Sequence, residues 1–322
     1  MATLPELPRV PLVVAPTPLV IAPRLSAKLG VEVWFKRDDL TGQGLGGNKV
    51  RGLEYLLGDA LARGCDSLVT GAGPQSNWAM LAALTARQCG LTPYLVFYGS
   101  PVGATGNLLL SELAGADIRF TGELDRASVD GAIEKLGASL STAGHQPYVV
   151  PRGGATPLGA AGYVRAGLEL ESQLMAQGLR PKQLWLPTGS CGTQAGLVAG
   201  ARWLRSSYDV VGVSVSRPVS ECVQRVTSLA NGAADLLGLP AVDDATVLDG
   251  YLGPGYGLAS RAGEAAARLV AGTEGVFLDP VFGAKAMAAL IDTARTGRLD
   301  GPVVFLLTGG AGTLFAGSKD VR

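Results

Sequence analysis

The chain has 322 residues, 47% of them hydrophobic and 17% charged, and it contains 46 glycines. These values are typical of a compact α/β protein of two domains, although the length alone also allows a single-domain barrel, and they exclude a disordered or fibrous chain. Because 27 Lys and Arg residues balance 27 Asp and Glu residues, no excess of positive charge favours a nucleic acid or an anionic membrane, and we expect a small-molecule partner.

Predicted strands and helices alternate along the chain. After a proline-rich start, short apolar or β-branched runs predict the strands Val31–Lys36, Ser67–Gly71, Pro93–Tyr98, Asp117–Phe120, Pro147–Val150, Gln183–Pro187, Val210–Val215 and Val303–Leu307. Between them, apolar residues recur at steps of three and four, which predicts helices over residues 50–61, 76–88, 107–114, 125–141, 157–177, 194–205, 219–237, 258–271 and 283–296. This alternation predicts open, twisted, mostly parallel sheets with helices on both faces, in three-layer α/β domains.

Two glycine-rich joints, near Gly52 and at Gly153-Gly154, indicate where domains meet, because no repeat and no linker of low complexity divides the chain. We expect a larger domain formed by residues 1–52 and 157–322, with a smaller α/β domain, residues 53–156, inserted between its two parts. Ligands of such folds bind in crevices at the carboxyl ends of strands.

The first segment with candidate chemistry runs from Lys36 to Gly42 and continues from Gly46 to Lys49, where a helix begins. Glycines before a helix allow the backbone to approach a ligand closely. A lysine on the first turn that is desolvated in a cleft can have its pKa lowered enough to act as a nucleophilic amine and form a Schiff base. The local sequence also fits a lysine that is simply solvated near the start of a helix.

The second segment follows the apolar strand that ends at Pro187 and leads into a helix. Its small residues are Gly189, Ser190, Cys191, Gly192 and Thr193. Consecutive small residues expose backbone N–H groups at the positive end of a helix dipole, which suits a phosphate. A Walker A loop is excluded because no Gly-Lys-Ser/Thr follows, and the Rossmann spacing is not met. A plain strand-to-helix turn is the alternative.

A third turn of this kind, Gln75-Ser76-Asn77-Trp78, also lies between a strand and a helix. It offers a second helix N-terminus to an anion, for which we expect a carboxylate, and Ser76 could exchange a proton. The alternative is that Ser76 only caps the helix.

Other chemistry has little support. The four cysteines are widely spaced, so we expect free thiols and neither a zinc site nor disulfides. The single histidine, His145, makes histidine metal sites and Ser-His-Asp or Cys-His catalysis hard to build, and we expect it to be an ordinary loop residue. The start of the chain resembles no secretory leader and no run of about eighteen apolar residues follows, so we expect a cytoplasmic protein.

Taken in order, these segments and three later motifs resemble the D-cysteine desulfhydrase and 1-aminocyclopropane-1-carboxylate (ACC) deaminase family. The later motifs are Gly253-Pro254-Gly255-Tyr256-Gly257, Leu278-Asp279-Pro280-Val281 and Thr308-Gly309-Gly310. The resemblance extends from about Pro16 to Phe315. It implies the fold of the tryptophan-synthase β-subunit group (fold type II), pyridoxal 5'-phosphate (PLP) as cofactor, and a homodimer.

The resemblance also implies roles for particular residues. Lys49 matches the lysine that holds PLP as a Schiff base, with Asn48 beside it, and residues 189–193 match the phosphate-binding loop. Ser76 and Asn77 match the pair that meets the substrate carboxylate and the cofactor ring, and Ser76 is the proposed acid or base.

Further matches surround the substrate. Tyr256 matches a tyrosine that faces it, and Thr308 matches a threonine near the pyridine side of the cofactor. The same site is expected to include Gln75, Trp78 and Phe282.

Three residues depart from the family pattern. Phe282 and Gly283 stand where members usually have Tyr followed by Thr or Glu, which removes a hydroxyl and a polar partner of the pyridine nitrogen. Trp78 stands where a smaller polar residue usually follows Ser-Asn, which places a bulky ring near the expected carboxylate site. These departures leave the substrate open.

The resemblance implies a PLP-dependent lyase, in which Lys49 removes the α-proton of a small amino acid and a β-leaving group departs, giving a keto acid and ammonia. Without a polar partner for its pyridine nitrogen, the cofactor ring withdraws electrons less strongly, which disfavours opening of a cyclopropane ring. β-Elimination is therefore preferred to ACC deamination. Two other reactions, β-replacement and racemisation, remain alternatives. Two other classes of protein also remain: a PLP- or amino-acid-binding protein without catalysis, and a protein that binds a sugar phosphate or nucleotide phosphate without PLP.

Overall fold

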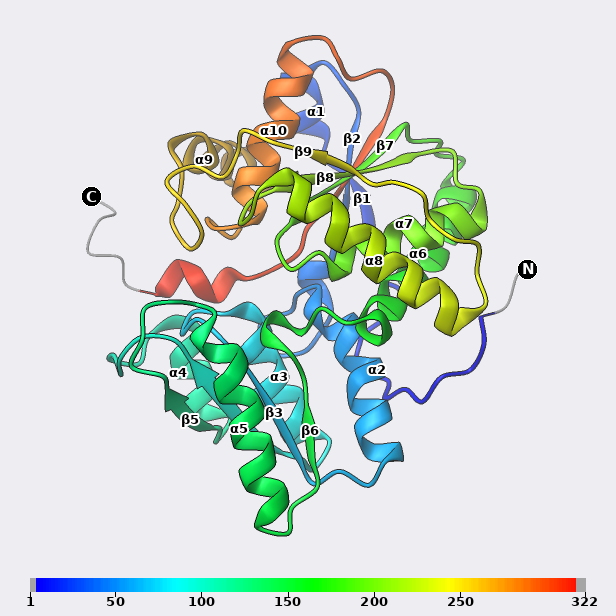
Figure 1. The fold of residues 1–322 in the computed structure, drawn as a ribbon. Coiled ribbons are helices and arrows are strands. Elements are labelled where there is room, and N and C mark those ends of the chain that lie inside the picture. The colour runs from blue at the N-terminus through cyan, green and yellow to red at the C-terminus, as the bar shows by residue number, and fades with distance from the viewer. Residues whose placement is uncertain (1–3, 317–322) are drawn as a thin grey trace.

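The computed structural model describes residues 4–316, which form two open sheets, one above the other in Figure 1, each flanked by helices. The larger sheet has the order β1-β2-β10-β7-β8-β9 and the smaller one the order β5-β4-β3-β6. The strands are β1 (Leu19–Ile21), β2 (Val33–Lys36), β3 (Ser67–Ala72), β4 (Thr92–Phe97), β5 (Asp117–Phe120), β6 (Pro147–Val149), β7 (Gln183–Thr188), β8 (Asp209–Ser214), β9 (Thr246–Leu248) and β10 (Val303–Leu306). β1 runs antiparallel to β2, and every other neighbouring pair in the two sheets is parallel.

Helices cover both faces of each sheet. They are α1 (Pro23–Leu29), α2 (Lys49–Ala62), α3 (Asn77–Gln88), α4 (Gly106–Leu113), α5 (Ser128–Thr142), α6 (Pro157–Gln177), α7 (Gly192–Leu204), α8 (Val219–Leu237), α9 (Arg261–Glu274) and α10 (Gly283–Arg295), with the 3-10 turns η1 (Asp38–Leu40), η2 (Arg152–Gly154) and η3 (Ala311–Phe315). Alternate residues of each strand point to opposite layers. In β7, Trp185 packs in the core with α1, α9 and α10, whereas Leu184 and Leu186 pack in the core with α6 and α7.

The smaller sheet follows the same rule. Leu68 and Leu95 belong to the core shared with α2 and α3, while Val69 and Val96 pack against α5. The prediction of open three-layer α/β sheets is therefore confirmed, and every predicted strand and helix occurs with bounds shifted by at most a few residues.

Three short elements, β1, β9 and α1, have no counterpart among the elements predicted from the sequence. β1 and β9 have three residues each, and α1 has seven, so none is long enough to show a period. β1 lies at the edge of its sheet and forms the antiparallel pair with β2.

Gly52 allows two helices to pack closely. It lies inside α2, where an added Cβ would come within 3.0 Å of the Gly159 carbonyl oxygen, so the glycine lets α2 pack closely on α6. All strands of the smaller sheet lie between Ser67 and Val149, inside the range expected for the inserted domain. The domain limits at residues 52–53 and 156–157 stay a prediction.

A buried ionic cluster fixes the first turn of α2. The Arg51 guanidinium donates to both carboxylate oxygens of Asp38, at 2.7 and 2.8 Å, and to Glu169, at 2.9 and 3.1 Å. Lys36 also bonds Glu169, and the Tyr163 hydroxyl donates to Asp38 at 2.5 Å. The cluster thus ties β2, α2 and α6 together two residues after Lys49.

Within residues 4–316, no helix has the length and apolar character needed to cross a membrane. The same residues contain no group of three His, Cys, Asp or Glu side chains that could hold a metal ion. All four cysteines are free, and His145 is exposed, with Nδ1 3.1 Å from an Asp66 oxygen.

Candidate active site

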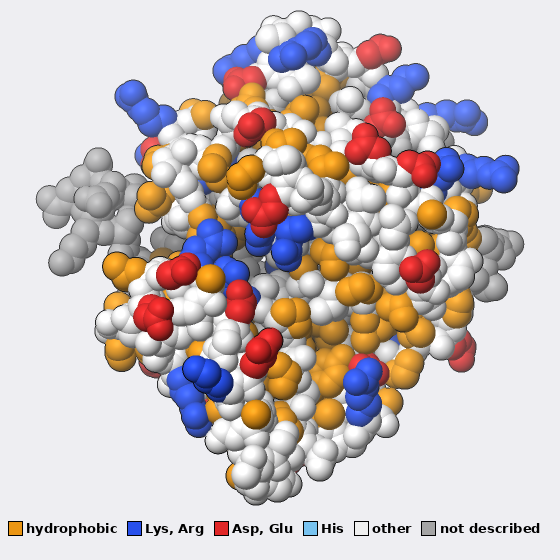
Figure 2. All heavy atoms as spheres, viewed as in Figure 1, with side chains coloured by type: hydrophobic (Ala, Val, Ile, Leu, Met, Phe, Trp, Pro, Cys, Tyr) orange, Lys and Arg blue, Asp and Glu red, His pale blue; other side chains and the backbone are white. Residues whose placement is uncertain are grey.

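A cavity of about 390 Å³ lies between the two sheets, at the carboxyl ends of several parallel strands. We call the part built on the larger sheet the larger body and the part built on the smaller sheet the smaller body. Lys and Arg side chains, with acidic ones among them, gather on the surface where the two bodies join (Figure 2). Of the predicted site residues, the lining contains Asn48, Lys49, Ser76, Asn77, Trp78, Gly189, Ser190, Cys191, Thr193, Tyr256, Phe282 and Thr308. The volume suits a small ligand with a cofactor.

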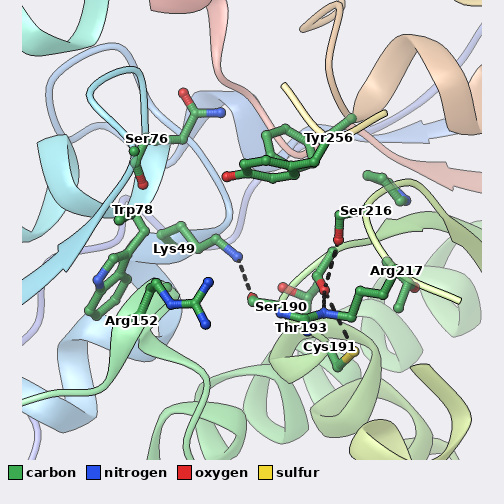
Figure 3. A pocket seen from close by; sticks show the side chains of 18 of the residues that line it. Lys49, Ser76, Trp78, Arg152, Ser190, Cys191, Thr193, Ser216, Arg217 and Tyr256 are labelled. Carbon is green, nitrogen blue, oxygen red and sulfur yellow. Dashed lines mark hydrogen bonds between the residues drawn. The ribbon is translucent and has the colours of Figure 1, made fainter. Parts of the chain in front are cut away.

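Lys49 begins α2 and extends into this cavity, where its Nζ lies 3.1 Å from the Ser190 hydroxyl (Figure 3). Burial disfavours the charged ammonium and lowers the pKa of Lys49 to about 8. The preceding turn holds the lysine in place, because the Asn48 N–H donates to the Thr308 carbonyl at 3.0 Å. The side chain has the lowered basicity that the sequence analysis required of a nucleophilic amine.

The segment 189–193 forms the N-terminus of α7. Cys191 has φ = 77°, a left-handed conformation that directs the chain into the helix. Within residues 4–316, no backbone N–H from Ser190 to Thr193 donates to a backbone carbonyl, so these groups are free to bind an anion. Asn48 Nδ2 donates to Thr193 Oγ1 at 2.8 Å, which joins this loop to the turn that carries Lys49.

The Cys191 thiol packs beneath this loop against Cys222 of α8, and both are buried. Contact with Cys222, together with burial, raises the pKa of the Cys191 thiol. Cys191 therefore stays a neutral thiol and adds no negative charge beside the candidate phosphate loop.

The turn before α3 provides the second helix N-terminus. Ser76 caps α3 by accepting a hydrogen bond from the Ala79 N–H at 3.2 Å, and its side chain faces the cavity (Figure 3). Asn77 accepts from Asn107 at 2.6 Å and donates to Asp279 at 3.3 Å. Burial raises the pKa of Asp279 to about 6. The amide of Asn77 is thereby fixed between the smaller body and the larger one.

Tyr256 and Phe282 form an aromatic wall, with ring centroids 6.0 Å apart in an edge-to-face arrangement. The Tyr256 loop is held by Lys285, whose buried Nζ donates to the carbonyls of Leu252, at 2.8 Å, and Gly255, at 3.0 Å. Burial raises the pKa of Tyr256, so its phenol is neutral. Gly283, the first residue of α10, is buried.

Three predicted residues differ from the rest in their placement. Gln75 lies outside the cavity lining and bonds Thr105 and Asn107 instead. Gly192 lines a small adjoining pocket. Trp78 is almost wholly buried, its indole N–H donates to Thr70 at 2.9 Å, and it contributes only part of the cavity wall. Gly154 makes room for that ring, since a Cβ there would lie 2.3 Å from it.

The sequence analysis missed four arginines of the lining, Arg126, Arg152, Arg217 and Arg225. Arg217 follows β8, the neighbour of β7, and its Nε donates to the Gly189 carbonyl at 2.9 Å. Its place could have been inferred, because the carboxyl ends of adjacent parallel strands meet at one edge. Arg126 lies in the loop before α5, and Arg152 begins the three-residue turn η2, so neither lies in a segment long enough to show a period.

Comparison with known proteins agrees with this geometry. Residues 10–309 match the family described as pyridoxal-phosphate-dependent enzymes. The chain belongs to that family. A D-cysteine desulfhydrase of Salmonella choleraesuis (strain SC-B67) is 42% identical and one of Salmonella paratyphi C (strain RKS4594) is 41% identical, each match covering 97% of both chains.

Solved structures show the same fold for this PLP-dependent enzyme. The crystal structure of an ACC deaminase homologue has a TM-score of 0.91 and 37% identity, and covers 97% of this chain and 94% of its own. A threonine deaminase of T.th., with a TM-score of 0.67 over 91% of this chain and 92% of its own, is 23% identical and supports the fold alone. The predicted family, fold type II and PLP cofactor are confirmed.

The residues of the cavity fit the cofactor. The N-terminus of α7 offers a phosphate N–H groups that bond no backbone carbonyl of the described residues, 4–316. Lys49 offers an amine of lowered basicity at hydrogen-bond distance from that loop. A glycine at 189 keeps the loop close to Phe282, because a Cβ there would lie 3.3 Å from that ring. The assignment of Asn77 and Thr308 to the ring of the cofactor stays a prediction.

Proposed function

We propose that this PLP-dependent lyase removes the α-proton of a small amino acid and expels its β-substituent, releasing a keto acid and ammonia. The observation that carries the proposal is Lys49, an amine with a pKa lowered to about 8 that lies between two helix N-termini, those of α3 and α7. Two anionic groups, a phosphate and a carboxylate, can thus be held on either side of one base. The relatives named D-cysteine desulfhydrase support a β-elimination.

Bound PLP supplies an electron-withdrawing ring that delocalises the charge left on the substrate α-carbon. Lys49 accepts the α-proton, which requires its neutral amine. Ser76 and the N-terminus of α3 hold the substrate carboxylate, and Ser76 exchanges a proton at its hydroxyl. The neutral Tyr256 phenol faces the leaving group as a donor, while Trp78 and Phe282 exclude water. Gln75 acts by bonding the loop at Thr105 and Asn107.

D-Cysteine-like elimination is preferred to ACC deamination on account of α10. Phe282 and Gly283 offer neither a hydroxyl nor a carboxyl group at the start of this helix. Opening a cyclopropane ring demands more electron withdrawal than expelling a good leaving group, so the missing polar partner affects ACC more. A substrate other than D-cysteine is compatible with the same residues.

The absorbance spectrum tests the role of Lys49. The purified protein with PLP is expected to show a yellow absorbance band that borohydride abolishes, because the cofactor is bound covalently to an amine. Lys49→Ala must lack this band, and the exposed Lys28→Ala serves as control and must keep it. A colourless wild-type protein after addition of PLP contradicts the proposal.

Product analysis then separates elimination from its rivals. Keto acid and ammonia released from D-cysteine or β-chloroalanine indicate elimination. A new amino acid formed with an added thiol indicates β-replacement, and interconversion of enantiomers indicates racemisation. A band at Lys49 with no turnover of any amino acid indicates a PLP- or amino-acid-binding protein.

We also propose that the enzyme is a cytoplasmic homodimer, which the family resemblance supports. Sedimentation analysis at several protein concentrations must give twice the mass of 32.9 kDa. Cell fractionation tests the location, and recovery outside the cytoplasm contradicts it.

A further inference from the structure

Arg126 is a cation of the cavity that the proposed chemistry leaves without a role. Its guanidinium carbon lies 3.9 Å from the centroid of the Tyr256 ring, so it stacks on the residue that faces the leaving group. It is half-buried, and within residues 4–316 no carboxylate lies within ion-pair distance of it. A guanidinium held in this way keeps its N–H donors for a ligand.

Arg152 lies on the same side of the cavity. It begins η2, and Figure 3 shows its guanidinium beside Trp78 and facing the space around Lys49. Its Nε and one terminal nitrogen each donate to Asp130 at 2.9 Å. The ion pair orients the Arg152 guanidinium. It leaves the other terminal nitrogen of this group without a hydrogen bond to residues 4–316.

The other anions of the reaction already have positions. The N-terminus of α7 suits the cofactor phosphate, and Arg217, which pairs with Glu221, lies beside it. The N-terminus of α3 suits the substrate carboxylate. Arg126 and Arg152 therefore face the part of the substrate that remains, which is its β-substituent.

We propose that Arg126, assisted by Arg152, forms a subsite for an oxyanion on the β-carbon, so that the substrate is an amino acid carrying a sulfonate or a phosphate there. The inference rests on the proposed β-elimination. The α-proton passes to Lys49, the electrons of the Cα–H bond form a Cα–Cβ double bond, and the bond from Cβ to sulfur or oxygen breaks. The leaving group takes that electron pair and departs as sulfite or phosphate, whose added charge the two guanidiniums stabilise.

The test compares substrates that have a charged β-substituent with one that has a neutral β-substituent. Because their leaving groups also differ, the change in their ratio between wild type and variants carries the result. Both enantiomers of cysteate and O-phosphoserine are compared with neutral β-chloroalanine by release of keto acid. In the wild-type enzyme we expect kcat/KM for at least one oxyanion substrate to exceed that for β-chloroalanine. The ratio of the two must fall about 10-fold or more in Arg126→Gln, and further in Arg126→Gln/Arg152→Gln, because a charge-assisted hydrogen bond is lost at each step.

Arg119→Gln is the matched control. Arg119 forms a similar ion pair with Asp117 at 3.0 Å but lies outside the cavity, so the ratio must stay within about 2-fold of the wild type. A binding measurement adds a readout that needs no turnover. Calorimetric titration of cysteate into Lys49→Ala protein must show binding. Adding Arg126→Gln to that variant must weaken the affinity, and so must added salt.

Two outcomes overturn the subsite. In the first, the ratio of the kcat/KM values does not change in either variant; if both values fall equally, the arginines bind the α-carboxylate. In the second, the wild type prefers β-chloroalanine. Failure of the proposed function looks different, because the wild type then releases no keto acid even from β-chloroalanine.

Discussion

Burial, more than residue type, sets the basicity of Lys49 and so its fitness for the proposed role of base. An exposed lysine has a pKa near 10.5, whereas desolvation in the cavity lowers that of Lys49 to about 8. At pH 7 about one Lys49 amine in ten is then neutral, against about one exposed lysine in three thousand. The neighbouring thiol of Cys191 does not reverse this shift, because its own raised pKa keeps it uncharged.

The rate of cofactor capture by the PLP-free protein should therefore depend on pH through Lys49. Since only the neutral amine reacts, the rate is expected to rise about 10-fold per pH unit below the pKa and to level off above about 8. Stopped-flow measurement of the yellow band from pH 6 to 10 gives the midpoint. N-acetyl-lysine methyl ester, measured in the same buffers, corrects for ionisation of PLP itself. A midpoint near that of an exposed lysine, above pH 10, contradicts the argument.

Single residues also mark the limit of what the sequence predicts. Lys49 could be found because it follows two glycines at the start of a helix, and residues 189–193 because small residues follow an apolar strand. Trp78 lines part of the cavity, but the direction of its indole is set by the hydrogen bond to Thr70, a contact between α3 and β3 that the local sequence does not contain. The position of Arg126 over Tyr256 likewise depends on tertiary packing and leaves no local pattern.

At the scale of elements, the turn that precedes α2 places Lys49. Gly46 has φ = 72°, and a Cβ there would lie 1.9 Å from the Asp39 carbonyl oxygen, so the turn has no room for a side chain. The Thr41 hydroxyl closes the same turn by accepting from the Gly47 N–H at 2.8 Å. The backbone around Lys49 is therefore held by contacts that only glycine permits.

Gly46→Ala should destabilise the protein by about 3 kcal/mol or more, because it adds a backbone clash to a left-handed conformation. We also expect loss of bound PLP, since the turn must shift. Gly90→Ala is the control. Its φ of 79° is similar, but beyond its chain neighbours no atom of residues 4–316 lies within 4 Å of the added Cβ, so the substitution should cost only about 1 kcal/mol. Urea unfolding and cofactor content measure both variants. Equal losses would show that backbone conformation alone matters at Gly46.

Element prediction succeeded where a period could be counted. The limits of α6 and α8 agree with the sequence prediction, because each is about twenty residues long with a regular apolar face. β1 and β9 are set by pairing with strands distant in sequence, which a local reading does not contain. Gly52 shows a further role that a local reading does not contain, since the glycine lets α2 pack closely on α6.

At the scale of the whole molecule, the two bodies meet through polar contacts at the cavity. Asp279 of the larger body accepts from Asn77 of the smaller one, and Thr313 donates to the same Asp279 oxygen at 3.0 Å. The Thr105 hydroxyl donates to the Ala316 carbonyl at 2.9 Å, and η3 lies against α4 in Figure 1. Residues assigned to the cofactor and substrate thus depend on how the bodies are held together.

The ionic cluster around Arg51 is the second such link, and its removal should destabilise the protein and weaken PLP binding together. Among residues 4–316, Arg51→Met leaves the fully buried Asp38 carboxylate with only two hydrogen-bond donors, the hydroxyls of Thr17 and Tyr163. Breaking a buried ion pair from one side costs about 3–5 kcal/mol because the remaining charge stays desolvated. Arg51→Lys should lose less stability, because a lysine keeps the positive charge. It should still lose some, because one ammonium cannot donate to the carboxylates of both Asp38 and Glu169 as the guanidinium does.

Arg63→Met, at the residue that follows α2, provides the matched control for this prediction. Arg63 pairs with Asp59 at 2.8 Å, but its side chain is 66% exposed, so little change in stability is expected. Urea unfolding gives the stability of each variant, and the yellow band gives the fraction that holds PLP. Because Arg51 lies two residues after Lys49, its loss should reduce both quantities. If stability falls while PLP is bound as in the wild type, the cluster supports the fold without positioning the lysine.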